Sequence, residues 1–183
     1  MPDKDMDSLN FPSAISVDQS YSVLDDEDLS SVYSVTSSAY NFRIEHGRRY
    51  HYYKDGHPFP YDDLSEDNEI TMHHMMLVLL DDKYYVSPIP EASLGCVVDV
   101  GTGSGLWAEG MAERLPNTTV VGIDTAPHQR PINPNCSYVL ADATEEWVLD
   151  DLSMKFDLVY IRSLFGVKDW PALYRQCFEY VSS

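Results

Sequence analysis

The sequence predicts an α/β domain in which helices cover both faces of a parallel sheet, and three observations lead to this expectation. After residue 94, short apolar runs rich in β-branched residues alternate with segments of helical periodicity. A glycine-rich turn follows the first of these runs, and an acidic residue stands near the end of each of the first three. Such alternation of strands and helices is typical of a parallel sheet.

Local composition sets the bounds of these elements. Buried parallel strands are short and rich in valine and isoleucine, and proline marks the limits of helices. Asp169 is expected to cap the last helix, with Pro171 in its first turn. We expect strands at 95–100, 118–124, 136–142 and 156–163, and helices at 105–115 and 169–181.

Another helix is expected ahead of the sheet, over about residues 66–82. Acidic residues stand near its start, as suits a helix N-terminus, and the prolines of "YYVSPIP" block its continuation. Its apolar residues at helical spacing are Met72, Met75, Met76, Leu79 and Leu80.

The chain divides into three zones by composition. Residues 1–38 are rich in serine and aspartate and lack periodicity, so we expect a disordered acidic tail. Residues 39–90 contain an aromatic, basic segment followed by the first helix, and residues 91–183 contain the sheet.

Charge and cysteine content limit the classes of function. With 12 Lys and Arg against 30 Asp and Glu, the net charge of −18 argues against direct nucleic-acid binding. The start lacks an apolar signal region, and the longest apolar run, "MMLVLL", is too short to span a membrane. Three widely spaced cysteines indicate reduced thiols in an intracellular protein, nuclear or cytoplasmic. His73 and His74 are adjacent on a helix and point in different directions, so no metal site is expected.

The stretch "DVGTGSG" contains the main functional signal. Gly101, Gly103 and Gly105 permit positive φ and a close approach of the backbone to a ligand. A dinucleotide fingerprint has the spacing G-x-G-x-x-G, whereas this turn has G-x-G-x-G and follows Asp99. A carboxylate there suits the ammonium of a methionine group better than a pyrophosphate. The spacing favours S-adenosylmethionine over NAD, and an NAD-type oxidoreductase remains the distant alternative.

Two further acids follow the next strands. Asp124 can accept both ribose hydroxyls, and Asp142 can accept the adenine amino group. Since the carboxyl ends of parallel strands meet at one edge, these acids and Asp99 would converge on one cleft. The structural alternative is that the glycines form only a turn and each aspartate only a cap. Their combination and order predict a site for S-adenosylmethionine.

Three blocks of the chain resemble the Rossmann-like S-adenosylmethionine-dependent methyltransferases and, among them, the fungal LaeA-like family. These blocks are "EHGRRYHYYKDG", "VVDVGTGSGLWAEGMAERLPNTTVVGID" and "FDLVYIRSLFGVKDWPALYRQ", and Trp107 and Trp170 match positions of the family's pattern. The resemblance runs from about Tyr33 to the last residue. It implies a methyltransferase linked to secondary metabolism, with a small-molecule or protein methyl acceptor.

The resemblance also implies roles for the residues of the glycine turn and the strand ends. Asp124 would hold the ribose and Asp142 the adenine end of the cofactor. The methionine side would be lined by Asp99, Gly101, Thr102, Gly103 and Gly105.

Outside the sheet, the resemblance implies that residues 48–51, with Arg48 and Tyr50, fold over the cofactor as an N-terminal lid. The alternative, left open, is that Arg48 and Arg49 pair with acids of the sheet domain. Arg162 would contact the cofactor carboxylate or form an ion pair. No side chain stands out as a general base, so the catalytic residue is unknown. The lid residues His51, Tyr50 and Tyr53 are candidates only by their place near the cleft.

The chain departs from the family's pattern in several places. The family usually has asparagine where His46 stands, D-x-S-P-x-Q-P where this chain reads "DTAPHQRP", and Arg and Asp within the segment "NEITMHH". The family's sheet has seven strands, so the resemblance implies a C-terminally truncated domain without strands five to seven. The fourth strand would then be an apolar edge that a protein partner covers. The alternative function is a catalytically incomplete regulatory partner in a velvet-type assembly, or a truncated gene product.

Overall fold

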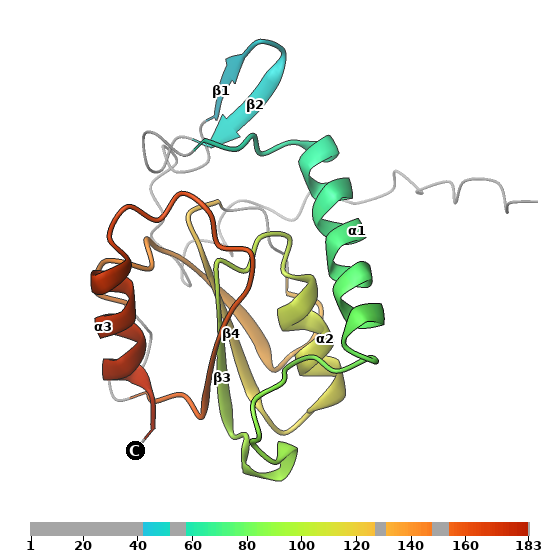
Figure 1. Ribbon diagram of the computed structural model, residues 1–183, viewed down its shortest axis with the longest axis vertical. Coiled ribbons are helices and arrows are strands. Elements are labelled where there is room, and N and C mark those ends of the chain that lie inside the picture. Colours follow the sequence, from blue (N-terminus) through green and yellow to red (C-terminus); the bar gives the residue numbers. More distant parts are fainter. Residues whose placement is uncertain (1–41, 52–57, 127–130, 148–153, 183) are drawn as a thin grey trace, which may run out of the picture. The chain divides into compact units, whose positions relative to one another are not determined.

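The computed structural model describes residues 42–51, 58–126, 131–147 and 154–182, in which a sheet domain follows a hairpin and a helix (Figure 1). The expected disordered tail, residues 1–38, and Tyr53 lie outside the described residues. Among the helices of the described residues, none is both long enough and apolar enough to cross a membrane.

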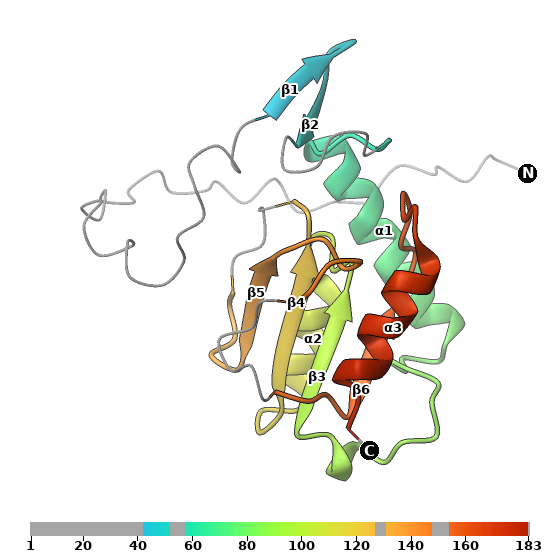
Figure 2. The ribbon, with the colours of Figure 1, turned by 90° about the vertical axis from the view of Figure 1, so that its left-hand side faces the viewer.

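Four parallel strands form the sheet, in the order β5-β4-β3-β6 (Figure 2). The predicted α/β fold with a parallel sheet is confirmed, and each strand lies within its expected range. From β3 the chain proceeds outward through β4 and β5 and then returns to place β6 on the other side of β3. Ligands of such sheets bind outside the carboxyl ends of the strands, where the order reverses. The strands are β3 (Cys96–Val100), β4 (Thr119–Asp124), β5 (Cys136–Leu140) and β6 (Leu158–Ile161).

Helices cover both faces of this sheet, with α2 (Leu106–Arg114) on one face and α3 (Trp170–Tyr180) on the other (Figures 1 and 2). Successive residues of a strand point to opposite faces. Val97 accordingly lies in the core cluster that α2 closes, and Val98 lies in the cluster that α3 closes. Burial on both faces explains why the strands appear in the sequence as continuous apolar runs.

The residues at the N-caps of α2 and α3 explain where these two helices begin. Asp169 accepts a hydrogen bond from the backbone N–H of Ala172 at 2.9 Å, and Pro171 lies in the first turn, as predicted. The N-cap of α2 is Gly105, whose φ of +82° favours glycine. A Cβ at Gly105 would lie 2.5 Å from the hydroxyl oxygen of Tyr138, so this position has no room for a side chain.

A β-hairpin that the sequence analysis did not predict precedes the first helix. It pairs β1 (Phe42–Glu45) with β2 (Arg48–His51) in antiparallel register. His46 and Gly47 form its two-residue turn with φ of 50° and 76°. Positive φ at both central residues is the geometry that matches the twist of a two-stranded hairpin. The signal in the sequence was the His–Gly pair between two short segments of strand-forming residues.

The first helix, α1, spans Asp63–Leu79, a few residues earlier than the predicted 66–82. Its N-cap is Asp62, which accepts from the backbone N–H of Ser65, and it ends ahead of Asp81 and Asp82, which both adopt positive φ. The helix buries His73, whereas Met72, Met75 and Leu79 of the predicted apolar face are exposed. A short 3-10 helix, η2 (Glu91–Ser93), then leads into the sheet and was not predicted.

Candidate functional site

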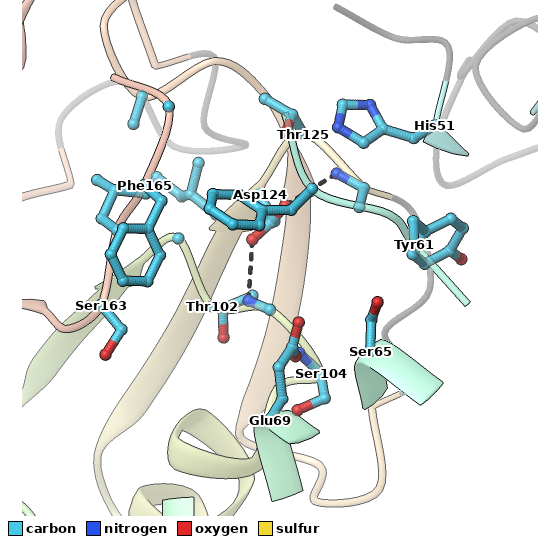
Figure 3. Close-up of a pocket in the computed structure, with 18 of the residues that line it drawn as sticks. His51, Tyr61, Ser65, Glu69, Thr102, Ser104, Asp124, Thr125, Ser163 and Phe165 are labelled. Carbon is cyan, nitrogen blue, oxygen red and sulfur yellow. Dashed lines mark hydrogen bonds between the residues drawn. The ribbon is translucent and has the colours of Figure 1, made fainter. Parts of the chain in front are cut away.

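A cavity of about 510 Å³ lies beyond the carboxyl ends of the strands. The segments that follow β3, β4, β5 and β6 line one side, and residues of β2, α1 and their connection line the other. Figure 3 shows side chains from both sides directed toward this space. Cavities of this size are typical of small-molecule sites.

The glycine turn after β3 lines the cavity with residues 101–104. Gly101 and Gly103 have φ of 74° and 56°, and the N–H of Gly101 donates to the carbonyl of Ile123 at 2.8 Å. A Cβ at Gly101 would clash with Leu164, and one at Gly103 would lie 2.7 Å from a carboxylate oxygen of Glu69. The turn therefore needs glycine for both conformation and close approach.

Two of the predicted strand-end acids line the cavity and are held by backbone donors. Asp124 accepts from the N–H of Gly103 at 2.9 Å and from the N–H of Ala126 at 2.9 Å (Figure 3). Asp142 accepts from the N–H and the hydroxyl of Thr144 at 2.8 and 2.7 Å. Each carboxylate keeps acceptor capacity for a ligand, because its two oxygens offer about four lone-pair sites.

The third predicted acid, Asp99, is placed differently. It is 3% exposed, does not line the cavity, and accepts a hydrogen bond from the Thr102 hydroxyl at 2.7 Å. Burial raises the pKa of Asp99 to about 7, against the opposing effects of the Thr102 hydrogen bond and the charge of Arg162. Thr102 lines the cavity, and Gly105 does not. Asp99 thus contacts the turn through Thr102, and its predicted contact with the cofactor stays a prediction.

Arg162 lines the cavity and contacts a histidine. Its Nη2 lies 3.1 Å from Nδ1 of His73, and since arginine can only donate, Nδ1 of His73 accepts. Burial, and then the charge of Arg162, lower the pKa of His73 to about 4. His73 is therefore neutral near pH 7 and fixes the direction of the guanidinium. From the sequence, His73 was considered only as a metal ligand, so this contact with Arg162 was not predicted.

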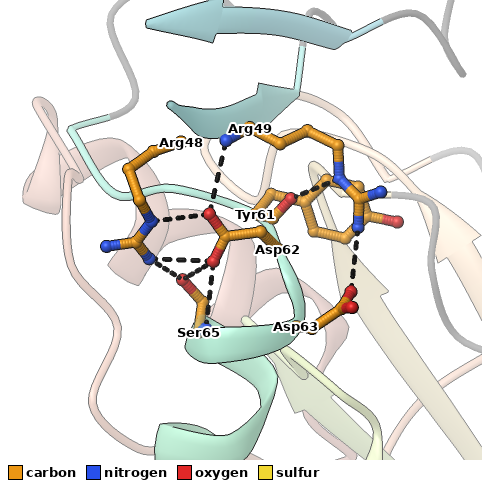
Figure 4. A network of polar contacts seen from close by, with 6 residues as sticks. All are labelled: Arg48, Arg49, Tyr61, Asp62, Asp63 and Ser65. Atoms are coloured by element: carbon orange, nitrogen blue, oxygen red, sulfur yellow. Dashed lines mark hydrogen bonds and ion pairs between the residues drawn. The ribbon is translucent and has the colours of Figure 1, made fainter. Parts of the chain in front are cut away.

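The predicted lid residues fall on two sides of the hairpin. Arg48 pairs with Asp62 through two hydrogen bonds of 2.6 and 2.8 Å (Figure 4). This pairing, above all, lowers the pKa of Asp62. Neither Arg48 nor Tyr50 lines the cavity, whereas Arg49 and His51 do. Alternation along β2 accounts for the difference, because residues two apart share a face.

Arg49 is held by the connection that leads to α1. Its Nε donates to the carbonyl of Tyr61 at 2.8 Å, and its guanidinium lies 5.2 Å from the centre of the Tyr61 ring (Figure 4). It also lies 3.6 Å from the carboxylate of Asp63. The acids that Arg48 and Arg49 contact thus belong to the start of α1 and not to the sheet domain.

Several cavity residues were not predicted from the sequence. Glu69 accepts from the backbone N–H of Ser104 at 2.7 Å, and the rings of Phe59 and Phe165 lie 5.4 Å apart. Glu69 and His73 are four residues apart on α1 and so share one face of the helix. This spacing could have indicated that Glu69 and His73 face the sheet domain together. The apolar methionines and leucines of the same helix instead suggested that another face is buried.

The chain is similar to methyltransferases in sequence. The family described as a methyltransferase domain matches residues 72–183. Methyltransferase pytC of Aspergillus terreus is 34% identical over 174 residues, which cover 93% of this chain and 52% of pytC. The protein-methionine methyltransferase laeA of Emericella nidulans is 31% identical over 156 residues, which cover 84% of this chain and 41% of laeA. The chain therefore spans about half or less of the length of these relatives.

The fold is also similar to that of a solved methyltransferase. The plantazolicin methyltransferase BpumL, solved in complex with a pentazolic desmethylPZN analog and SAH, aligns with a TM-score of 0.51 and 20% identity. The alignment covers 65% of this chain and 47% of BpumL. At this level of identity the likeness concerns the fold.

Proposed function

The chain belongs to the methyltransferase-domain family, and from this premise we propose that it binds S-adenosylmethionine and serves transfer of the methyl group to a small-molecule or protein acceptor. The observation that supports this most directly is the convergence of Asp124, Asp142 and the glycine turn on one cavity. Relatives named as a methyltransferase and as a secondary metabolism regulator support a role in secondary metabolism.

The residues of the cavity fit this cofactor. Gly101 and Gly103 line the cavity, and their positive φ lets the turn pass close to a ligand. Asp124 is suited to the ribose hydroxyls and Asp142 to the adenine amino group. Glu69 and Asp124 also place negative charge beside the turn, which suits a cationic sulfonium ligand.

The cofactor, when bound, would supply a methyl group that is already activated for transfer. The protein's part is then to bind, orient and shield the reactants. Asp124 is fixed by two backbone donors, so it can orient a ligand with little loss of its own freedom. Phe59 and Phe165 form an apolar part of the cavity wall, which would favour an acceptor with apolar surface.

Calorimetric titration with S-adenosylhomocysteine tests the proposal without any acceptor. We expect the full chain to bind it and Asp124→Asn to weaken binding about tenfold or more, because hydrogen bonds to a charged acceptor are strong. Asp67→Asn is the matched control, since Asp67 is exposed on α1 and does not line the cavity. A folded wild-type chain that binds neither S-adenosylhomocysteine nor S-adenosylmethionine would refute the proposal.

A second candidate function is that of a regulatory protein that acts through a protein partner. An exposed apolar row on α3, next to the edge strand β6, favours it: Trp170, Tyr174 and Phe178 are 39%, 59% and 85% exposed. Surfaces of this kind often mark interaction sites. Methyl transfer by the isolated chain, with unchanged rate in a Phe178→Ser variant, would remove this candidate. Dependence of transfer on an added fungal protein fraction, lost in Phe178→Ser, would support it.

A further inference from the structure

Glu69 is the residue through which α1 reaches the glycine turn. Its carboxylate accepts from the backbone N–H of Ser104 at 2.7 Å, next to the N–H of Gly103 that donates to Asp124 (Figure 3). Two carboxylates from different elements therefore occupy consecutive backbone donors of one turn. Glu69 as a whole residue is exposed, but its carboxylate turns inward and lines the cavity.

Other acids that line the cavity have different contacts or positions, since Asp62 pairs with Arg48 and Asp169 caps α3. Asp124 and Asp142 stand at the ends of β4 and β5, where a ribose and an adenine would lie. Asp99, which the sequence suggested for the ammonium, is buried behind Thr102 and does not reach the cavity. Like Asp124, the cavity-lining Glu69 accepts from a backbone N–H of the glycine turn, so its carboxylate is placed for a positively charged group at this turn.

We propose that Glu69 accepts the α-ammonium of the cofactor's methionine moiety and thereby ties α1 to the bound ligand, an assignment that rests on the proposed function. An ammonium has three donors and no acceptor, so it needs oxygens such as those of a carboxylate. The Gly103–Ser104 segment holds Glu69 at the same turn that Asp124 contacts, so the two carboxylates can bind adjacent parts of one ligand.

The electrostatics of the site agree with this role. Partial burial raises the pKa of Glu69, and the nearby charges of Asp124 and Glu66 raise it further, while the Ser104 hydrogen bonds lower it. Unrelieved negative charge of this kind favours a cationic group in its vicinity. Arg162, a cation that also lines the cavity, is oriented by its contact with His73.

The test compares two ligands on two variants of the full chain. S-adenosylhomocysteine carries the ammonium, and 5′-methylthioadenosine shares the adenosine and thioether but lacks the amino-acid part. We expect Glu69→Gln, which keeps an oxygen for the Ser104 N–H, to weaken S-adenosylhomocysteine binding about tenfold by calorimetry. Binding of 5′-methylthioadenosine should change less than about twofold, because it presents no ammonium to this position.

Asp67→Asn is again the matched control, because it removes the same charge from the same helix away from the cavity, and it should leave both affinities unchanged. Equal or tighter binding of S-adenosylhomocysteine by Glu69→Gln would overturn the inference and indicate that Glu69 competes with the ligand. Equal weakening of both ligands would also overturn it, because the effect would then not depend on the ammonium. If the wild-type chain binds neither ligand, the proposed function itself fails, which is a distinct result.

Discussion

The sheet domain and the N-terminal segment, composed of β1, β2 and α1, are held in place by different kinds of interaction. In β3, Val97, Val98 and Val100 are fully buried, and core clusters lie on both faces of the sheet. In α1, by contrast, His73 is the buried residue. The contacts of this segment include ion pairs and hydrogen bonds, such as those of Arg48 with Asp62 and of Glu69 with Ser104.

Because of this difference, we expect the two sides of the cavity to differ in stability. Buried apolar surface stabilises by roughly 25 cal/mol per Å² and needs no exact geometry. Partly exposed ion pairs contribute only about 0–1 kcal/mol each. The sheet side of the cavity is therefore expected to be the stable side, and the α1 side the one that opens most readily.

The largest effect is expected where the sheet domain loses packing. Trp107 is 2% exposed, stacks on Tyr160 with ring centres 3.9 Å apart, and donates to the carbonyl of Tyr84. Trp107→Ala should lower the free energy of unfolding by about 3–5 kcal/mol, measured by urea denaturation. Trp170→Ala, at an exposed position, should cost about 1 kcal/mol. Similar losses for the two variants would show that burial of the ring does not determine the loss of stability in the sheet domain.

The second effect concerns the pH dependence of the sheet domain. The pKa of Asp99 is raised from 3.8 to about 7 by burial, so the folded state holds a proton that the unfolded state releases. The contribution of Asp99 to stability is thus fully present below about pH 4 and is lost as the pH rises to about 7. Asp99→Asn should reduce the fall in unfolding free energy between about pH 5 and about pH 8 by roughly 2 kcal/mol.

Denaturation curves of Asp99→Asn and of the wild type at the two pH values measure this difference. Asp67→Asn should keep the wild-type dependence, because that carboxyl is exposed. An unchanged dependence in Asp99→Asn would show that its carboxyl ionises normally in the folded state.

The smallest effect is expected in the N-terminal segment. Asp62→Ala removes the N-cap of α1 and the partner of Arg48, at a cost of about 1 kcal/mol. Hydrogen exchange should report this as about fivefold faster exchange of α1 amides, with the sheet amides unchanged. Asp63→Ala is the control, because the Asp63 side chain is 98% exposed. Equal acceleration in the sheet would show that the two regions unfold together.

The sequence predicted the sheet domain well because its signals are local and repeated. Valine-rich runs between helical segments located the four strands, and Asp169 and Pro171 located the start of α3. Asp124 and Asp142 could be placed in one cavity because strand ends of a parallel sheet meet at one edge. The predicted contact of Asp99 with the ligand stays a prediction, and the sequence did not indicate that the Asp99 carboxylate would be buried and would accept from the Thr102 hydroxyl.

The N-terminal segment was less predictable, because its contacts join residues far apart in the sequence. The pairing of Arg48 with Asp62 and the reach of Glu69 to Ser104 depend on how two elements meet, which no local pattern encodes. The hairpin was missed because its turn, His46–Gly47, is an uncommon version of the favoured Asn–Gly pair.

The stacking of Trp107 on Tyr160 has a practical consequence for spectroscopy. The chain has three tryptophans, and among the described residues Trp107 alone of them lines the cavity. Its indole N–H is fixed on the carbonyl of Tyr84 and its ring lies flat on a phenol, so its emission depends on that arrangement. Because Trp107 lines the cavity, a bound molecule would change the surroundings of this buried ring. Ligand titrations can therefore follow the protein's own fluorescence, with Trp147 and Trp170 as a constant background and no attached dye.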